Sequence, residues 1–405
     1  MKSFISELIA REFARQESTI SLIASENYAS NSVLRATGSV LTNKYAEGYP
    51  GRRYYGGCEV VDQVEICAMD TGKRLFETDH MNVQPHSGST ANMVVYFSQL
   101  NPGDTVLGMS LQAGGHLTHG HKLNFSGKLF NFVSYSVSPE DELIDYDEID
   151  LLAAQHKPKM IVAGTSAYSR IVDYEKFHEI AKRHRALLFV DMAHVAGLIA
   201  ARVHPSPMPF ADIVSSTTHK TLRGPRGGFI CCKGEFAKSI DRAVMPGCQG
   251  GPLMHVIAAK GVAFEEALRP EFKTYQEQVL KNAKIMSKMF VDLGYRVVSG
   301  GTDTHLFLLD TKQSHGLTGD IIERALGLCN IIVNRNSIPF DTESPLVTSG
   351  IRIGTPAITT RGFGEREVVQ LVHWIDEAIK KRDDDKFLAA LREQVVGLCK
   401  LVHVY

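Results

Sequence analysis

Short apolar runs alternate with helical patterns through the middle of the chain, and this alternation constrains the fold more than any other feature. The runs that we predict as strands are 105–109, 129–136, 159–163, 187–191, 212–217 and 228–232. The helical patterns lie near 89–100, 146–157 and 174–185. Continuously apolar strands separated by helices are typical of a mostly parallel sheet that is covered on both faces. We therefore predict a large α/β domain over residues 51–270.

The flanking segments predict two further parts. After Pro270 comes a long helical pattern whose apolar stripe comprises Phe272, Tyr275, Val279, Ala283, Met286, Phe290 and Leu293. Isolated strands follow near 296–298, 304–310, 331–334 and 350–353, together with helices near 317–328, 364–380 and 384–399. We expect residues 271–405 to form a small C-terminal α+β domain. Residues 1–50 are predicted to be an N-terminal arm, with one helix followed by an irregular segment.

Charge and cysteine content exclude several classes of protein. Lys and Arg number 44 and Asp and Glu number 45, so the net charge of −1 gives no support for a nucleic-acid partner. No apolar run approaches the roughly 20 residues that span a bilayer. Residues 1–18 lack the apolar core of a signal peptide. The seven cysteines form no CxxC pair, which suits reduced thiols. We expect a soluble cytoplasmic enzyme.

Polar residues that follow a strand are the first candidates for a site, because ligands of open α/β sheets collect at the carboxyl ends of the strands. Ser87, Gly88, Ser89 and Thr90 precede a predicted helix. Small residues there let backbone N–H groups converge on a phosphate, and the hydroxyl groups add donors. An ordinary helix cap would account for the same residues.

Asp191 and Lys220 follow two later strands. Asp191 ends the run LLFVD, three residues before His194, and could be a structural cap, a metal ligand or the partner of a ring nitrogen. Lys220 comes after Ser-Thr-Thr-His, whereas lysine normally lies on a solvated helix face. Lys220 could be a phosphate clamp or an imine-forming nucleophile, but no GxxxxGK[ST] pattern surrounds it. An imine needs an amine that can lose its proton, which burial and nearby positive charge favour.

These features together match what pyridoxal phosphate (PLP) requires of a protein. A lysine must hold the aldehyde, and an acid must keep the pyridine nitrogen protonated. We infer that Lys220 carries PLP as a Schiff base and that Asp191 is the acid. His116 in GGHLTHG is the candidate for stacking on the ring. Arg352 in SGIRIGTPA is the candidate for binding a substrate carboxylate with its planar fork.

A metal site is the alternative reading of the histidines in HLTHGH. His116, His119 and His121 are close in the sequence, and a zinc site could use such spacing. However, no HExxH motif or cysteine cluster accompanies them, and the neighbouring glycines indicate a loop. We therefore expect no metal cofactor.

Several long motifs together resemble the serine hydroxymethyltransferase family across nearly the whole chain. They are LIASENYAS (22–30), LTNKYAEGYPGRRYYGG (41–57), NVQPHSGSTAN (82–92), VDMAHVAGL (190–198), TTHKTLRGPRGG (217–228), QGGPLMH (249–255) and GIRIGTPAITTRGF (350–363). The resemblance implies a fold-type-I PLP-dependent transferase, similar to aspartate aminotransferase. It also implies one-carbon metabolism and glycine biosynthesis, in which serine gives its hydroxymethyl carbon to tetrahydrofolate and yields glycine and 5,10-methylenetetrahydrofolate.

The resemblance also implies roles for individual residues. Lys220 would form the internal aldimine, Asp191 would pair with the pyridine nitrogen and His116 would stack on the ring. The other cofactor contacts would come from Ser166 and His194 at the phenolic oxygen, from Gly88, Ser89 and His219 at the phosphate, and from Arg226. Tyr45 and Gly251 would complete the phosphate site from a second subunit of a homodimer, which could pair into a tetramer.

Substrate and folate contacts follow from the same resemblance. Serine would meet Arg352, Ser25 and His194, together with Tyr55, which a second subunit would offer. Glu47, offered by the partner chain, would face the serine hydroxyl group and transfer a proton, beside Lys220 and His219 as catalytic residues. Folate would contact Tyr54, Leu111, Gly115, Leu117, Asn336, Ser344, Pro345 and Leu346. Two positions depart from the family pattern, because aromatic residues are common there where this chain has Met245 and Leu346.

The expected reaction passes through a PLP aldimine and a quinonoid carbanion, whether the carbon leaves as formaldehyde or is displaced by a folate nitrogen. Two rival functions are a folate-independent aldolase for β-hydroxy amino acids and a binding protein that has lost its chemistry. Serine turnover that does not depend on folate would favour the aldolase. A colourless protein, without bound PLP, would favour the binding protein.

Overall fold

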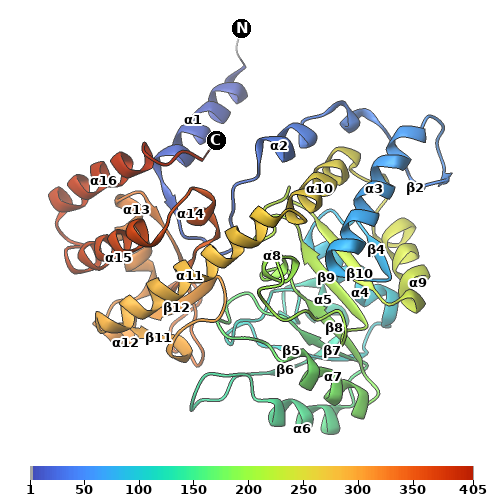
Figure 1. Ribbon diagram of the computed structural model, residues 1–405. Coiled ribbons are helices and arrows are strands. Elements are labelled where there is room, and N and C mark those ends of the chain that lie inside the picture. The colour runs from blue at the N-terminus through green and yellow to red at the C-terminus, as the bar shows by residue number, and fades with distance from the viewer. Residues whose placement is uncertain (1–2, 405) are drawn as a thin grey trace. The chain divides into compact units, whose positions relative to one another are not determined.

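The computed structural model describes residues 3–404, and the chain divides into two compact units. One unit comprises Ala29–Gln276, and the other combines the segment that ends at Tyr28 with the segment that begins at Glu277. The second boundary falls inside helix α11 (Pro270–Asp292), which is yellow to orange in Figure 1. The division into an arm, a large domain and a small domain, with boundaries at 50 and 270, stays a prediction.

A seven-stranded sheet forms the centre of the 29–276 unit. Its strand order is β4-β10-β9-β8-β7-β5-β6, and all neighbours pair in parallel except for the two pairings of β10. The strands are β4 (His80–Asn82), β5 (Thr105–Met109), β6 (Asn131–Tyr135), β7 (Met160–Ala163), β8 (Leu187–Asp191), β9 (Ile213–Thr217) and β10 (Gly228–Cys232). The predicted mostly parallel α/β sheet is confirmed. Only β4 was missed among its strands.

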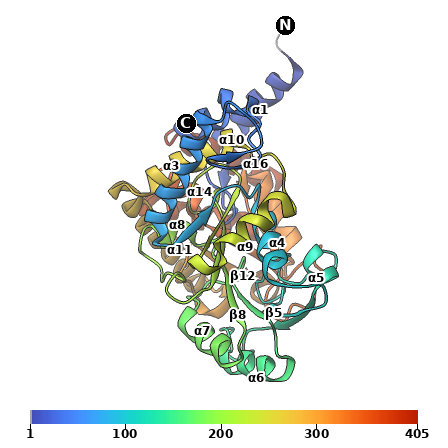
Figure 2. The same cartoon turned by 90° about the vertical axis from the view of Figure 1, so that its right-hand side faces the viewer.

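Helices cover both faces of this sheet. Successive strand residues face opposite sides, so Phe189 belongs to one apolar cluster while Leu188 and Val190 belong to the other. One cluster includes residues of α3 (Glu59–Phe76), α6 (Tyr146–His156), α7 (Tyr174–Arg183), α8 (Ala196–Ala200) and α10 (Met254–Ala267). The other includes residues of α4 (Gly88–Gln99), α5 (Phe125–Leu129) and α9 (Ala237–Arg242). Figure 2 shows α3 and α8 on one side of the strands and α4 and α5 on the other.

Several helices of this unit start at a residue whose side chain caps them. Ser87 accepts a hydrogen bond from the amide of Thr90 at the start of α4. Asp145 and Asp173 cap α6 and α7 in the same way. Because such caps satisfy amide groups that the helix leaves unpaired, they fix where each helix begins. The cap on α4 places that start directly after the exit of β4.

The segment before α3 is more regular than the sequence indicated. Ser30 caps a short helix, α2 (Asn31–Thr37), whose Val33 packs against Ala259 and Ala263 of α10. A 3₁₀ turn, η1 (Val40–Asn43), and a two-stranded hairpin of β2 (Gly48–Tyr49) and β3 (Arg52–Arg53) follow. The other short elements of the unit are η2 (Gly234–Phe236) and the π-helical turn η3 (Ala243–Cys248).

The second unit is built on a four-stranded antiparallel sheet with the order β11-β12-β15-β14. Its strands are β11 (Arg296–Val297), β12 (Leu306–Asp310), β14 (Asn334–Asn336) and β15 (Gly350–Gly354). Separately, β1 (Ile20–Ser21) pairs in parallel with β13 (Ile331–Ile332). The helical elements are α1 (Phe4–Ser18), α11, η4 (Val298–Gly300), α12 (Thr311–His315), α13 (Gly319–Leu328), α14 (Pro356–Thr360), α15 (Glu365–Lys380) and α16 (Asp385–Cys399).

A separate apolar core holds the second unit together. It joins Ile20 and Leu22 to residues of α11, α13, α15 and α16. The first segment of the chain therefore contributes a strand and two core residues to a unit that is otherwise built from residues after 276. Across residues 3–404, the structure contains no helix that is both long and apolar enough to cross a bilayer.

Candidate active site

Asp191 and Lys220 lie at the carboxyl ends of neighbouring parallel strands. Asp191 is the last residue of β8 and is in register with Ser215 of β9. Lys220 follows the end of β9 by three residues and is buried. Gly164 follows β7 at the same edge, and a Cβ atom placed there would lie 2.3 Å from the carbonyl oxygen of Asp191. The parallel arrangement thus brings the exits of three strands together.

The carboxylate of Asp191 is held by two side chains and one amide. Its Oδ2 accepts a hydrogen bond from Asn92 Nδ2 at 2.8 Å and lies 3.4 Å from Nε2 of His119. Its Oδ1 accepts from the amide of Ala193 at 3.0 Å. Burial alone would raise the pKa of Asp191, but the hydrogen bond and charge of His119 and the charges of His116 and Lys220 lower it strongly. Asp191 therefore stays ionised and can face a cationic group.

His116 presents a neutral ring next to this carboxylate. Its Nδ1 lies 2.7 Å from Oγ1 of Thr118, and its ring meets the ring of His119 edge to face at 5.8 Å. Burial lowers the pKa of His116 to about 4; Asp191 opposes the shift, whereas His119 and Lys220 add to it. An uncharged imidazole held in place by its neighbours is suited to stacking on a flat ligand.

A metal-ligating group is present in part of the predicted histidine cluster. Ligand atoms of His116, His119 and Asp191 all lie within 4.8 Å of one another, and His121, the third histidine of the predicted cluster, is not part of this group. The same three residues are already linked through Thr118 and Asn92, since Asn92 Nδ2 lies 2.7 Å from Thr118 Oγ1. Each of the three side chains therefore has at least one hydrogen-bond partner among the neighbouring residues.

The start of α4 lies against the residues that precede Lys220. A Cβ atom placed on Gly88 would lie 2.6 Å from Cγ2 of Thr217, so α4 begins in close contact with the end of β9. Two buried polar atoms beside this contact have no hydrogen-bond partner, namely Oγ1 of Thr217 and Nδ1 of His219. Buried polar atoms are normally paired, so these two indicate a ligand with donor or acceptor groups.

His219 is uncharged in this setting. Burial lowers its pKa to about 3, and the charges of Arg226 and Lys220 act in the same direction. Arg226 is exposed. Helix N-termini favour anions, and α4 is long enough for its aligned peptide groups to contribute. The orphaned atoms, the glycine contact and the neighbouring cations fit the phosphate of PLP. The carboxylate and the neutral ring fit its pyridine.

Ser166 and His194 lie in the loops that follow β7 and β8. Ser166 is half-buried, and its amide donates to the carbonyl oxygen of Gly114 at 2.7 Å. His194 is buried, and its carbonyl oxygen accepts a hydrogen bond from Thr221 Oγ1 at 2.9 Å. Because Thr221 directly follows Lys220, this bond connects the exits of β8 and β9.

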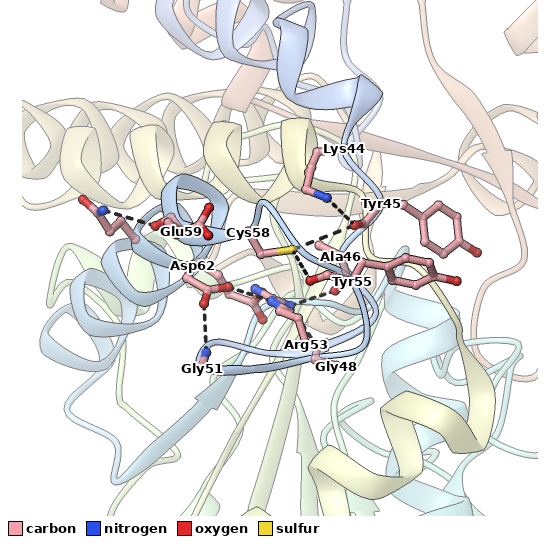
Figure 3. Close-up of polar contacts among 12 residues, drawn as sticks. Lys44, Tyr45, Ala46, Gly48, Gly51, Arg53, Tyr55, Cys58, Glu59 and Asp62 are labelled. Carbon is pink, nitrogen blue, oxygen red and sulfur yellow. Dashed lines mark hydrogen bonds and ion pairs between the residues drawn. The ribbon is translucent and has the colours of Figure 1, made fainter.

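Tyr45 and Tyr55 lie together on the surface of the same unit (Figure 3), and Tyr45 lies next to Glu47. The rings of Tyr45 and Tyr55 meet edge to face at 5.1 Å, and the Tyr45 hydroxyl group lies 3.3 Å from Oε1 of Glu47. Tyr45 is 55% exposed and Tyr54 is 73% exposed. A Cβ atom placed on Gly251 would lie 2.9 Å from the Tyr45 ring. The residues that the resemblance assigns to a second subunit therefore share one surface.

Arg53 holds this surface segment from below (Figure 3). Its guanidinium donates to Asp62 at 2.8 Å, to Glu65 at 2.6 Å and to the carbonyl oxygens of Ala46 and Gly48 at 2.9 Å. Both Arg53 and Glu65 have almost fully buried side chains. A planar donor with several fixed partners restricts the backbone on either side of Glu47.

Three of the four folate candidates of this unit lie in one loop after β5, whereas Tyr54 directly follows β3. Leu111 and Leu117 are exposed, while Gly115 is buried between them. A Cβ atom placed on Gly115 would lie 2.2 Å from the carbonyl oxygen of Met109, so only glycine fits there without movement of the loop. The loop thereby turns back on β5 and exposes two apolar side chains.

The remaining predicted residues belong to the second unit. Arg352 lies on β15, and its Nε donates to Asn334 Oδ1 of the paired strand β14 at 3.3 Å. Burial lowers the pKa of Arg352 to about 10, so it remains a cation at neutral pH. Asn336 is also on β14, and its side chain donates to the carbonyl oxygen of Ser337. Ser25 is half-buried after β1, and Ser344, Pro345 and Leu346 are exposed.

Four further side chains, none of which was predicted to belong to the PLP site, support it; His119 among them was predicted only as a candidate metal ligand. Asn92 and His119 hold Asp191, and Gln249 accepts from the amide of His86 and donates to the carbonyl oxygen of Gln84, next to the start of α4. Lys260 is buried beneath the same segment. Only Lys260 left a clear signal, because it is a charge in the apolar run MHVIAAKGVAF.

Comparison with known protein families agrees with this geometry. The model of the family described as serine hydroxymethyltransferase matches residues 2–375 of the chain. Enzymes of this family use PLP, take tetrahydrofolate as co-substrate, bind serine and glycine, and are oligomeric. The expected transferase reaction of one-carbon metabolism is thereby confirmed. The chain belongs to the serine hydroxymethyltransferase family and is a PLP-dependent enzyme that interconverts serine and glycine.

Proposed function

We propose that residues 29–276 bind PLP at the exits of β7, β8 and β9, with Lys220 as the covalent attachment point. The observation that carries this proposal is the meeting of an ionised Asp191, a neutral His116 and a buried Lys220 beside the start of α4. PLP, when bound, supplies an electron-withdrawing ring that stabilises negative charge on the α-carbon of an amino acid. Asp191 keeps a proton on the ring nitrogen, and His116 packs on the ring face.

The phosphate is held by Gly88 and Ser89 at the N-terminus of α4 together with His219. The partnerless Nδ1 of His219 and Oγ1 of Thr217 support this assignment, since a phosphate oxygen or its hydration water would satisfy them. Ser166 and His194 approach the phenolic oxygen, and Arg226 adds positive charge to the cofactor shell. Lys220 and His219 are catalytic residues in this assignment, because both contact the cofactor.

The substrate carboxylate is bound by the guanidinium of Arg352, with Ser25 and Tyr55 as further donors. His194 orients the amino acid, and Glu47 moves the proton of the serine hydroxyl group. Folate is bound by Tyr54, Leu111, Gly115, Leu117, Asn336, Ser344, Pro345 and Leu346. Exposed apolar side chains such as Leu117 support this assignment, since the ring system of folate needs an apolar surface.

The enzyme is a homodimer in which Tyr45, Glu47, Tyr55 and Gly251 serve the site of the neighbouring subunit. The exposure of Tyr45 and Tyr55 on one surface supports this proposal. No residue of α1 is buried within the described chain, although Phe4, Ile5 and Ile9 lie on it and are exposed. Apolar helix faces of this kind are typical of protein interfaces.

A cytoplasmic location is supported by the cysteines. All seven cysteines lie within residues 3–404 and are free thiols, and adjacent Cys231 and Cys232 are both buried. Burial raises the pKa of each of these two thiols, so they remain protonated and unreactive. Such thiols suit a reducing compartment.

The direct test measures glycine formation from serine with and without tetrahydrofolate. The expected result is turnover that requires tetrahydrofolate and disappears in the Lys220→Ala variant, together with the absorbance of lysine-bound cofactor. Glu47→Gln should retain serine binding but lose folate-dependent turnover, and Arg352→Ala should weaken serine binding with little effect on cofactor absorbance. Serine cleavage that is indifferent to tetrahydrofolate would instead identify an aldolase.

A further inference from the structure

Lys260 is a buried cation on the apolar side of α10. Its exposed fraction is 1%, and its Nζ donates three hydrogen bonds, to the carbonyl oxygens of Val83 at 2.7 Å, Pro85 at 3.0 Å and Gly228 at 2.7 Å. A lysine ammonium has three donors, so all of them are used on backbone acceptors. Lysine is almost never fully buried without such compensation.

The three acceptors belong to the two segments that form the candidate PLP site. Val83 and Pro85 lie between β4 and the phosphate-binding start of α4 at Ser87 and Gly88. Gly228 begins β10 and ends the loop that carries Lys220. Lys260 therefore joins the backbone that precedes the phosphate site to the backbone that follows the covalent attachment point.

Backbone hydrogen bonds between residues of the Lys220 loop close this loop. The amide of Thr218 donates to the carbonyl oxygen of Gly227 at 3.1 Å, and the amide of Gly224 donates to Thr218 at 2.6 Å. The amide of Gly228 then donates to the carbonyl oxygen of Pro85 at 3.1 Å. Pro85 thus accepts from Gly228 and from Lys260 together, which ties the two segments at one point.

Glycines let the two segments approach Lys260 closely. A Cβ atom on Gly227 would lie 2.5 Å from Cε of Lys260, and one on Gly228 would lie 2.4 Å from the carbonyl oxygen of Ser87. Neither position has room for a side chain. A shift of the Lys260 side chain would therefore move the backbone of Gly227, and the adjoining Gly228 would in turn displace Ser87.

Burial of this ammonium is costly, which indicates that its hydrogen bonds have a role beyond filling space. Burial lowers the pKa of Lys260 to about 7, and the charge of Glu65 opposes the shift. An apolar side chain of the same length would occupy the volume without the cost of desolvating a charge. What only the ammonium supplies is a common donor for carbonyl groups from two segments.

We propose that Lys260 is a positioning residue that sets the spacing between the phosphate-binding start of α4 and the loop of Lys220. It contacts neither cofactor nor substrate and acts through the backbone at Pro85 and Gly228. The inference rests on the proposed assignment of Gly88 and Ser89 to the phosphate. Loss of Lys260 should weaken binding of the phosphate more than it weakens covalent attachment at Lys220.

The test compares the affinities of cofactor-free protein for PLP and for pyridoxal, which lacks the phosphate. Both are measured by titration of the absorbance of lysine-bound cofactor. In Lys260→Met, the preference for PLP over pyridoxal should fall by about tenfold or more, the size of a lost hydrogen bond to a charged group. A larger loss of affinity for PLP than for pyridoxal indicates positioning, because general destabilisation would weaken the binding of both ligands alike.

Arg361→Met is the matched control for the loss of a buried cation. Arg361 is 3% exposed and donates to the backbone carbonyl groups of residues 16, 17, 19, 399 and 402, none of which is assigned to the site. This control should keep the wild-type preference. If Lys260→Met does not fold, Gly227→Ala serves instead, because its methyl group displaces Lys260 without removing the charge.

Each outcome decides one question. A Lys260→Met or Gly227→Ala protein that keeps the wild-type preference, or loses PLP and pyridoxal affinity equally, overturns the inference alone. A wild-type protein that shows no preference for PLP, or a Lys220→Ala variant with unchanged absorbance, overturns the proposed site instead. A lowered preference in the Lys260 variant, with a normal preference in the Arg361 control, supports the inference.

Discussion

Asp191 stays ionised in a buried position because its neighbours outweigh the cost of its desolvation. The Asp191→Asn variant retains the shape of the side chain but removes the charge that we propose faces the ring nitrogen. We expect kcat to fall by roughly 100-fold or more, since a buried charge at the reacting group contributes several kcal/mol to catalysis. Steady-state kinetics at saturating PLP measures the change. A variant with bound cofactor and near-wild-type kcat would contradict the role of Asp191.

The low pKa of His219 predicts a pH dependence for the stability of cofactor-free protein. The pKa is about 3 in the folded chain against 6.5 for an unperturbed histidine, so the folded state binds fewer protons between these values. Its contribution to stability is complete above pH 6.5 and is lost as the pH falls toward 3. By pH 5 the loss should reach about 2 kcal/mol.

Urea denaturation of wild type and His219→Asn at pH 7.5 and pH 5 measures this contribution as a difference between the two proteins. The variant should lose less free energy of unfolding on acidification than wild type does. Equal losses would mean that His219 becomes protonated in the folded chain near its ordinary pKa.

Among single residues, the sequence revealed those whose type is unusual for their position. Lys220 after a strand and Asp191 at the end of an apolar run could be selected without a structure, and the structure places both at one edge of the sheet. Asn92 could not be selected, because an asparagine in a helix has no feature that indicates contact with Asp191, 99 residues away in the chain. Long-range partners of this kind become visible only when the strand order is known.

At the scale of elements, apolar strands in the middle of the sheet were the most predictable. The bounds of β5, β8 and β10 agree with the predicted runs, because each run is largely apolar and a polar residue either ends it or follows it. Strand β4 was missed because it has three residues, His80, Met81 and Asn82, and pairs at the edge with β10 only. The irregular segment predicted before residue 50 contains α2, whose packing on α10 could not be read from the sequence.

The contact between α4 and β9 predicts a reciprocal pair of substitutions. In Gly88→Ala, the new methyl group meets Cγ2 of Thr217, which is buried on a central strand and has little room to move. The start of α4 should shift, and PLP affinity should fall by about tenfold. Titration of cofactor-free protein with PLP measures the effect.

Thr217→Ser supplies the control for this element, because it removes Cγ2 and keeps the hydroxyl group. The double variant Gly88→Ala/Thr217→Ser should regain most of the lost PLP affinity, whereas Thr217→Ser alone should stay close to wild type. Lack of recovery in the double variant would show that glycine at position 88 is required for another reason than the contact with β9.

At the scale of the whole molecule, the chain presents aromatic side chains on its surface that we propose serve a neighbouring subunit. Tyr45 and Tyr55 meet on an exposed surface, while the buried network of Arg53 holds the backbone between them. A rigid support beneath exposed aromatic side chains is expected where those side chains contact a partner. The sequence alone could not show this arrangement, because neither exposure nor oligomeric state follows from a local pattern.

The proposed shared site predicts that two inactive variants restore activity when their subunits exchange. In the proposed dimer, Tyr45→Ala alters a residue that a chain contributes to its neighbour's active site. Lys220→Ala alters a residue of the chain's own active site. A hybrid dimer of the two has one damaged site and one intact site. If exchange is random, half of the dimers are hybrids, so about a quarter of wild-type activity should return. Mixing Lys220→Ala with Asp191→Asn is the control, because both residues belong to the same chain's site and no intact site can form. If the first mixture stays as inactive as the control after mass spectrometry has confirmed subunit exchange, each chain carries a complete site of its own.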